Sequence, residues 1–340
     1  MNVEEMKSFP VMARQSCIKC AIGCKRKWLY KYRLGIELRG EQMQEAATLG
    51  KIYHKFMQYG PGNDARVSGW VKQLQVNLMA RVDKGEDIDG TMVRKATELT
   101  HLYNRAKAMA HIFWEAYPLP PYLEIVGTEI DCSYRIGEVE VGGTIDRILQ
   151  NTDTGRFWIG DYKSTGRKLE AIFGGLAWSV QARLYRLLTI KYLEQKQMLR
   201  KGDDDLKGLI MDGIVRPGIK LCRTDEKNAK TWGVSIDDAY LQRVKDWYKE
   251  KEEAGEPVML SKAIIFAEPV MNRELMEAIS MIARLNYEPQ KLERFPRDIT
   301  RMACYRYERQ CEYHDLCETD PAYWDGLFEI KYKIKEEETK

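Results

Sequence analysis

The segment Glu140–Thr165, EVGGTIDRILQNTDTGRFWIGDYKST, is the stretch from which the fold can be inferred. Two runs rich in Val, Ile, Phe and Trp flank the cluster Asn-Thr-Asp-Thr-Gly, a composition typical of a β-hairpin whose turn uses a glycine. If Asn151 pairs with Arg156, the register of the hairpin places Asp146 directly across from Asp161. The sequence therefore predicts two carboxylates facing each other on neighbouring strands.

Two further charged residues fall on the same predicted surface. Lys163 shares a face with Asp161, because side chains alternate along a strand. Residues 122–141, YLEIVGTEIDCSYRIGEVEV, indicate another strand that turns at Gly137-Glu138, and this turn puts Glu129 opposite Asp146. Three neighbouring acids repel one another unless a cation lies between them, so the pattern predicts a divalent metal site.

The alternative is a structural one, in which Asp146 caps a turn while Asp161 and Lys163 form a solvated surface pair. The apolar residues Ile145, Trp158 and Ile159 indicate buried strands instead, and carboxylates at the end of a buried strand need a compensating partner. We nevertheless expect neither Asp161 nor Lys163 to pack in the core.

Composition bounds the class of protein. The chain has 340 residues, of which 44% are hydrophobic and 31% charged, as in a soluble globular protein. No apolar run approaches the roughly 18 residues of a membrane span, and the first ten residues, MNVEEMKSFP, are too polar for a signal peptide. We therefore expect a cytoplasmic protein without a membrane partner. The net charge of +3 neither requires nor excludes nucleic acid.

Two helices are predicted around candidate site residues. Residues 41–59, EQMQEAATLGKIYHKFMQY, carry His54 and end before Gly60-Pro61-Gly62. Residues 176–193, LAWSVQARLYRLLTIKYL, place Gln181 and Tyr185 one turn apart on one face. Taken alone, His54, Gln181 and Tyr185 would be ordinary packing or surface residues. They become candidate site residues because an acidic metal site is predicted beside them.

The chain is expected to form one domain, 1–340. We divide it into an N-terminal helical region (11–60), a helical insertion (61–121), the core (122–193), a second insertion with an exposed helix at 237–255 (194–260) and a C-terminal cysteine region (261–340).

Cysteine spacing predicts a second metal centre. Eight cysteines in a reducing compartment are not expected to form disulfides. Cys304, Cys311 and Cys317 form a C-x6-C-x5-C series, which is typical of metal ligation. A fourth ligand could come from His314 or from an N-terminal cysteine, where Cys17, Cys20 and Cys24 are the choices.

Five motifs in order resemble those of a known family. They are Cys24-Lys-Arg-Lys-Trp28, Gly50-x-x-x-His54, Gly143-x-x-Asp146, Asp161-x-Lys163 and Gln181-x-x-x-Tyr185. Together they resemble the RecB-type nucleases of the PD-(D/E)xK superfamily, in the iron-sulfur branch that includes AddB nuclease domains and CRISPR spacer-acquisition nucleases. Two features depart from that family: Lys25 replaces a proline, and the cysteine spacing is wider than C-x2-C-x5-C.

The resemblance implies an α/β fold of the restriction-endonuclease type, with a central mixed sheet flanked by helices and the chain ends joined by a [4Fe-4S] cluster. The implied roles are as follows: Cys24, Cys304, Cys311 and Cys317 bind the cluster; His54, Asp146, Asp161 and the Tyr162 carbonyl bind Mg²⁺ or Mn²⁺; Lys163 is catalytic; Gln181 and Tyr185 support the site; and Glu129 is a further candidate.

The function implied is a metal-dependent DNA exonuclease that acts on single- or double-stranded ends in recombination, repair or phage DNA metabolism. The chain contains no G-x-x-x-x-G-K-[S/T] loop, so unwinding would come from a helicase or recombination protein as partner. Two alternatives remain, a non-catalytic DNA-binding or assembly module and a zinc-stabilised interaction protein.

Overall fold

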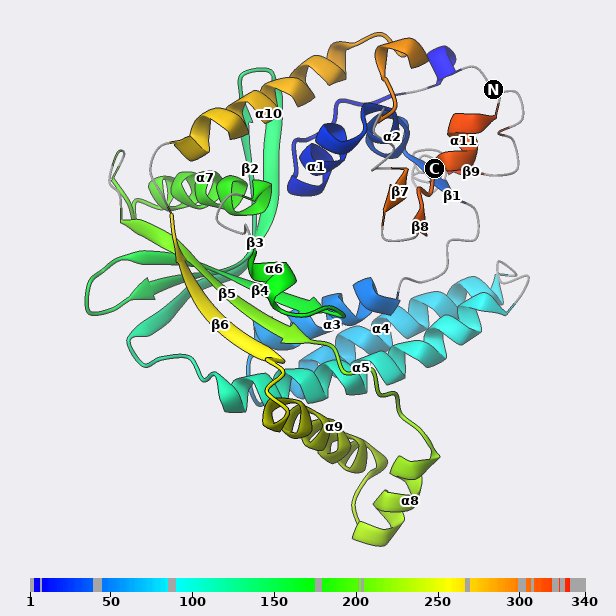
Figure 1. Cartoon of the computed structure of the whole chain (residues 1–340), viewed down its shortest axis with the longest axis vertical. Helices are drawn as coiled ribbons and strands as arrows, with labels where there is room; N and C mark the ends of the chain where they lie inside the picture. Colours follow the sequence, from blue (N-terminus) through cyan, green and yellow to red (C-terminus); the bar gives the residue numbers. More distant parts are fainter. Residues whose placement is uncertain are drawn as a thin grey trace.

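The computed structural model describes the chain in segments. They are residues 3–6, 8–38, 45–84, 90–174, 179–200, 202, 205–266, 270–298, 304–306, 309–319, 324 and 328–330. Within them the chain forms one central sheet with helices on both faces (Figure 1). This is the mixed α/β architecture expected from the sequence.

The central sheet has five strands in the order β2-β3-β4-β5-β6. Only β4 and β5 are parallel, and the other neighbours are antiparallel. The strands are β2 (Leu123–Ile136), β3 (Val139–Asn151), β4 (Phe157–Thr165), β5 (Leu206–Val215) and β6 (Met259–Ile265).

The two predicted hairpins have the predicted registers. The amide of Asn151 donates to the carbonyl of Arg156 at 2.8 Å, and Gly137 adopts a positive φ of 59° in the turn between β2 and β3. The β3–β4 pairing runs only from Gln150↔Phe157 to Arg147↔Gly160. Beyond that point β3 stays with β2 and β4 stays with β5, so the sheet forks.

One face of the sheet is covered by α1 (Gln15–Gly23), α7 (Val180–Gln195) and α10 (Val270–Tyr287), which form the first hydrophobic core with strand residues such as Ile159 and Met211. Ser179 begins α7 as an N-cap and accepts from the Ala182 amide at 3.1 Å.

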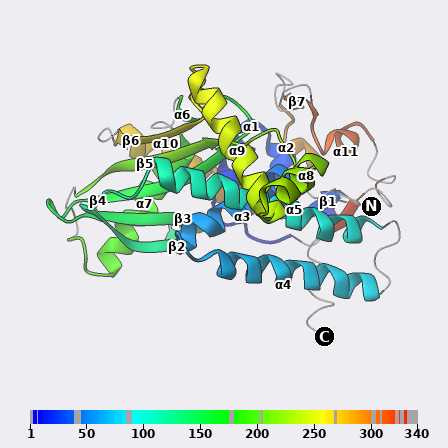
Figure 2. The same ribbon diagram turned by 90° about the horizontal axis from the view of Figure 1, so that it is seen from below.

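The other face is covered by α3 (Glu45–Tyr59), α4 (Asp64–Asp83), α5 (Thr91–Ala116) and α9 (Ile236–Glu253). Figure 2 shows α4 and α5 as long helices beside α3. The predicted helices at 41–59 and 176–193 are thus present, although residues 41–44 and 176–178 lie outside the described ones.

Two details differ from the expectations. The stretch 194–260, expected to be an insertion, supplies β5, which lies between β4 and β6 in the sheet, and the first residues of β6. Helices α8 (Arg223–Trp232) and α9 connect these two strands. The sequence of β5, LKGLIMDGIV, is buried on both faces, with Met211 in the first core and Ile214 in the second. Also, α9 is not simply exposed, since Tyr240 and Tyr248 pack in the second core.

The N- and C-terminal regions lie together. Strand β1 (Ile36–Leu38) pairs with β9 (Phe328–Ile330), and the Tyr30 ring meets that of Trp324 edge-on at 5.4 Å. Figure 1 places α11 and β7 near α2 and β1. The small elements of this region are α2 (Lys25–Trp28), the π-helical turn η2 (Leu29–Arg33), the 3-10 turns η1 (Val3–Glu5) and η4 (Leu292–Arg294), β7 (Tyr305–Arg306), β8 (Arg309–Gln310) and α11 (His314–Glu318). Elsewhere, the short helix α6 (Glu170–Phe173) follows β4.

None of the described helices is long and apolar enough to cross a bilayer.

Candidate active site

The fork between β3 and β4 holds the two predicted aspartates. Each lies one residue beyond the last paired residues, Arg147 and Gly160. Asp146 accepts a 2.8 Å hydrogen bond from the amide of Tyr162, so its carboxylate is tied to the backbone of β4. Asp161 is fully buried, contrary to the expectation that it would stay out of the core.

A chain of polar contacts holds Asp161. The Lys163 ammonium lies 2.9 Å from its Oδ2, and Gln181 donates to its Oδ1 at 2.6 Å. Gln15, at the start of α1, donates in turn to Gln181 at 2.9 Å. Helices on the covering layer therefore fix the carboxylate from behind, while Lys163 is still one-third exposed.

Asp161 and Lys163 form a pair in which a buried acid lies beside a cation. Burial raises the pKa of Asp161 to about 6; Lys163 opposes the rise and Asp146 adds to it. Burial would lower the pKa of Lys163, but the attraction of Asp161 and Asp146 outweighs it and the pKa is raised. Lys163 is therefore a cation at neutral pH.

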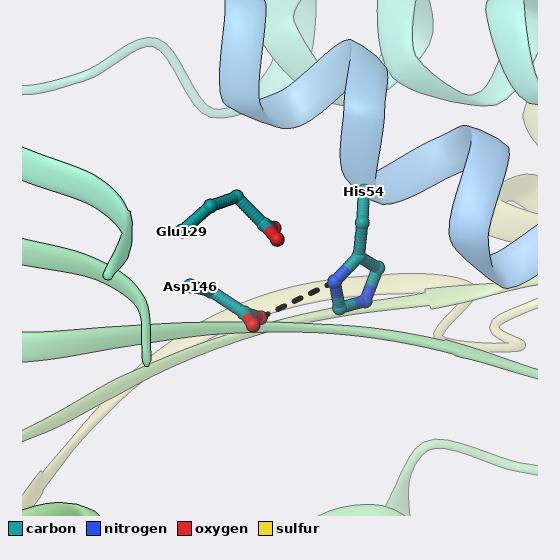
Figure 3. A group of neighbouring side chains, drawn as sticks. All are labelled: His54, Glu129 and Asp146. Atoms are coloured by element: carbon teal, nitrogen blue, oxygen red, sulfur yellow. Dashed lines mark ion pairs between the residues drawn. The ribbon is translucent and has the colours of Figure 1, made fainter. Parts of the chain in front are cut away.

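A trio of metal-compatible ligands lies beside this pair. The side chains of His54, Glu129 and Asp146 each offer a ligand atom, and these atoms lie within 4.8 Å of one another. Figure 3 shows the imidazole and both carboxylates pointing toward one another. The Nδ1 of His54 lies 3.5 Å from the Oδ2 of Asp146. The trio joins α3, β2 and β3 at the mouth of the fork.

Glu129 reaches this position through an unusual backbone. The neighbouring pairs Thr128↔Arg147 and Ile130↔Ile145 place it opposite Asp146, as counting from the turn predicts. Its φ is +49°, in the left-handed region that residues with a Cβ avoid. Such outliers cluster at functional sites, where the surrounding structure holds them in place.

The remaining predicted residues divide between two faces. Tyr185 lies on α7 and lines the cavity into which His54, Glu129 and Asp146 face; burial raises its pKa, and Asp161 and Asp146 add to the shift. The Tyr162 side chain lies on the opposite face of the sheet, under the guanidinium of Arg147 at 4.5 Å. The Tyr162 ring also meets the His54 imidazole edge-on at 6.1 Å, so toward the metal trio Tyr162 offers this ring contact and its backbone groups.

Glycines in two of the motifs permit close packing at the site. A Cβ at Gly143 would meet Leu188 of α7 at 3.2 Å, and one at Gly50 would lie 3.6 Å from the Ser164 hydroxyl on β4. The first contact is tighter than ordinary packing, so Gly143 lets α7 lie close to β3.

An open cavity of about 590 Å³ surrounds the trio. Residues not predicted from the sequence contribute to it, among them the cations Arg14, Lys51 and Lys55 and the aromatic Trp70. Lys51, Lys55 and His54 share one helix, and that clustering was available in the sequence. Nothing local marks Gln15, because its partner is far away in the chain.

A buried ion pair supports the fork from the other face. Arg147 of β3 binds Asp212 of β5, and Asp212 also accepts from the Ser261 hydroxyl at 2.6 Å. Burial raises the pKa of Asp212, while Arg147 and then Ser261 oppose the rise. This network ties β3, β5 and β6 together behind the site.

The four predicted cluster ligands line a separate cavity of about 540 Å³. They are Cys24, Cys304, Cys311 and Cys317. His314 also lines it, whereas Cys17 is buried and accepts a 3.0 Å hydrogen bond from the Trp28 indole. Cys20 packs beside the first core. Among the N-terminal cysteines of the described chain, only Cys24 faces this cavity.

Both donor sets fit the groups expected from the sequence. At the fork, His54, Glu129 and Asp146 offer carboxylate and imidazole ligands, which suit a divalent cation. In the second cavity, thiols gather beside the cations Lys27 and Arg297, a donor set that suits zinc or an iron-sulfur cluster.

The chain belongs to the PD-(D/E)XK nuclease superfamily, whose family model matches residues 15–318. Nucleases of this superfamily typically use Mg²⁺ or Mn²⁺. The chain is also similar to protein VC1899 from Vibrio cholerae, at 10% identity and a TM-score of 0.18, over 66% of this chain and 60% of that protein's. No curated protein matches the chain.

Proposed function

We propose that the protein is a metal-dependent DNA nuclease whose reaction takes place at the fork between β3 and β4. The observation that carries this proposal is the convergence of His54, Glu129 and Asp146 within 4.8 Å, next to the Asp161–Lys163 pair. A structural ion pair alone would not need a second acid held by a left-handed backbone.

The trio would hold Mg²⁺ or Mn²⁺, with Asp161 and the Tyr162 carbonyl as further ligands, and the imidazole favours Mn²⁺. When bound, such an ion lowers the pKa of an attacking water and offsets the charge of the scissile phosphate. Glu129 is a more central ligand in this arrangement than the sequence suggested.

The other residues act on the substrate or on each other. Lys163 lines the cavity, and its ammonium would stabilise negative charge on the phosphate oxygens. Gln181 and Gln15 keep Asp161 oriented. Tyr185 borders the cavity, where it would position Lys163 or a phosphate.

The RecB-type motif order supports an exonuclease that acts on DNA ends in recombination, repair or phage DNA metabolism. A partner helicase would supply unwinding for duplex substrates. Arg14, Lys51 and Lys55 give the cavity the positive charge that a phosphate backbone needs.

We also propose that the cysteine cavity holds a [4Fe-4S] cluster bound by Cys24, Cys304, Cys311 and Cys317. The cavity has room for more than one ion, and neighbouring Lys27 and Arg297 would offset the negative charge of a thiolate cluster. A zinc ion bound by the same thiols is the alternative, and it would leave the protein colourless.

The proposed activity is tested by incubating the full chain with end-labelled linear single strands, linear duplexes and circular single strands in Mn²⁺, Mg²⁺ or EDTA. An exonuclease shortens the linear substrates in metal and leaves circles intact. Cleavage of circles would show endonuclease activity instead, and binding without cleavage of any substrate would indicate a non-catalytic DNA-binding module.

A further inference from the structure

A second cavity, of about 570 Å³, lies past the ends of the parallel strands β4 and β5. Its walls come from the start of α3, from α5 and from the residues that follow the two strands. They include Glu45, Ala46, Arg105, Gly166 and Arg216. Because Ala46 also lines the catalytic cavity, the two cavities adjoin.

Arg216 is anchored at the mouth of this cavity. Its amide donates to the Thr165 carbonyl at 2.6 Å, which fixes its backbone beside the end of β4. Its Nη1 donates to the Ala46 carbonyl at 3.0 Å. Gly166 leaves room for the guanidinium, since a Cβ there would meet Nη2 at 3.1 Å. The side chain is therefore held in one place while half-buried.

Arg105 brings a second guanidinium to the same cavity from α5. Its side chain is 11% exposed, its Nη1 lies 2.7 Å from the Glu45 carboxylate, and its Nη2 donates to the Pro217 carbonyl. Its buried Nε has no hydrogen-bond partner among the described residues. A buried cation with an unmet donor is costly unless an anion completes its environment.

The charges of the cavity do not balance. Glu45 is the acid in its wall, and its carboxylate is shared between Arg105 and Lys220, which lies 3.1 Å away. Burial lowers the pKa of Arg216, Arg105 lowers it further, and Glu45 opposes the shift. Two guanidiniums and an ammonium thus face one carboxylate, and the charges of the described residues at this cavity sum to a net positive value.

The position of the cavity indicates which class of ligand it can bind. Gly166 lies three residues beyond Lys163, which is about 10 Å along an extended chain at roughly 3.3 Å per residue. That distance is short enough for one nucleic acid strand to reach both places. Guanidinium groups present forked donors that match phosphate oxygens.

We propose that Arg216 and Arg105 form a subsite for a backbone phosphate of the substrate strand, close to the phosphate that is cleaved. The proposal rests on the nuclease function above and adds a positioning contact to it. Arg216 is the better residue to test, because Arg105 is more deeply buried and its loss would disturb folding.

The test is a binding measurement in EDTA, where cleavage does not occur. A short fluorescein-labelled DNA strand is titrated with wild type, Arg216→Gln, Arg216→Lys and, as a control, the exposed Arg223→Gln. Each phosphate of the strand is then replaced in turn by a neutral methylphosphonate. We expect Arg216→Gln to weaken binding about tenfold, and to reduce the slope of log affinity against log salt by about 0.7. Arg216→Lys should recover part of the affinity.

The methylphosphonate series identifies the contact. For wild type, one neutral linkage should weaken binding, and the same linkage should have no further effect in Arg216→Gln. If the effects of Arg216→Gln and of the methylphosphonate on binding free energy are additive at every linkage, the subsite is overturned. Metal-dependent cleavage together with unchanged binding by Arg216→Gln would also overturn it while leaving the nuclease function intact. Arg216-dependent binding without cleavage in any metal would contradict the nuclease function and support the subsite.

Discussion

Glu129 on β2 faces Asp146 on β3 at a point where the backbone of Glu129 is left-handed, with φ of +49°. The pairs on either side keep the register, so the conformation is local to one residue. It turns a carboxylate into the fork beside His54. A backbone cost accepted at a single acidic residue suggests selection for metal binding rather than for stability.

Replacing Glu129 should separate its effect on metal binding from its effect on stability. Glu129→Gly removes the Cβ that disfavours the left-handed region, so the metal-free protein should be more stable than Glu129→Ala by about 1 kcal/mol. Urea unfolding in EDTA measures the difference. Equal stabilities for the two variants would show that the conformation is not strained.

Metal binding should respond to the charge of Glu129 and not to nearby surface charge. Glu129→Gln keeps the shape but removes an anionic ligand, and calorimetric titration should show about 10- to 100-fold weaker Mn²⁺ binding. Glu124→Gln, an exposed residue on the same strand, is the control and should bind like wild type. Normal Mn²⁺ affinity in Glu129→Gln would remove this residue from the site.

The buried Asp161 should make the metal-free protein sensitive to pH. Its pKa is raised from 3.8 to about 6, so the folded state holds the proton more tightly than the unfolded state does. The stabilisation from protonation is full below about pH 4 and is lost as pH rises through 6. Asp161→Asn resembles the protonated form, so its stability advantage over wild type in EDTA should be larger at pH 7.5 than at pH 5. An advantage that does not change with pH would contradict the raised pKa.

The cysteine cavity should distinguish Cys24 from its neighbours. In anaerobically purified protein, Cys24→Ala should lose iron and thermal stability, because it lines the cavity with Cys304, Cys311 and Cys317. Cys20→Ala and the exposed Cys222→Ala should keep the iron and the brown colour. Full iron content in Cys24→Ala with loss in Cys20→Ala would show that the fourth ligand lies one helical turn earlier.

Cys17 requires a separate expectation. The family resemblance assigns Cys24, and not Cys17, to the cluster, and the structure shows Cys17 buried and accepting a hydrogen bond from the Trp28 indole. Cys17→Ala should therefore retain iron and still lose about 1 kcal/mol of stability. The pair of measurements, iron per chain and melting temperature, separates a packing role from ligation.

Local rules predicted much of the site. The turn residues and the alternation of side chains fix which residues are opposite, so Asp146, Asp161, Lys163 and Glu129 could be placed by counting from two turns. Helical spacing likewise gave Gln181 and Tyr185. These features depend on neighbours in sequence, where propensity and periodicity are informative.

Features that depend on tertiary packing could not be predicted in this way. The complete burial of Asp161 results from helices α1 and α7, and the Gln15–Gln181 contact joins those helices. The segment that begins at Gly208 was expected to form strand and loop, but the place of β5 between β4 and β6 was not predicted, because it depends on tertiary packing. The left-handed φ of Glu129 also has no sequence signal, since glycine usually marks such positions.

Cleavage by Asp146→Asn tests the central claim most directly, because Asp146 belongs to the metal trio and holds the Tyr162 amide. The measurement is the rate at which an end-labelled linear strand is shortened in Mn²⁺, for wild type, Asp146→Asn and the exposed control Asp153→Asn. Wild type and the control should cleave at equal rates that fall to zero in EDTA, and Asp146→Asn should be slower by at least about 10²-fold. A folded Asp146→Asn protein that cleaves at the wild-type rate would contradict the assignment of the active site to this fork.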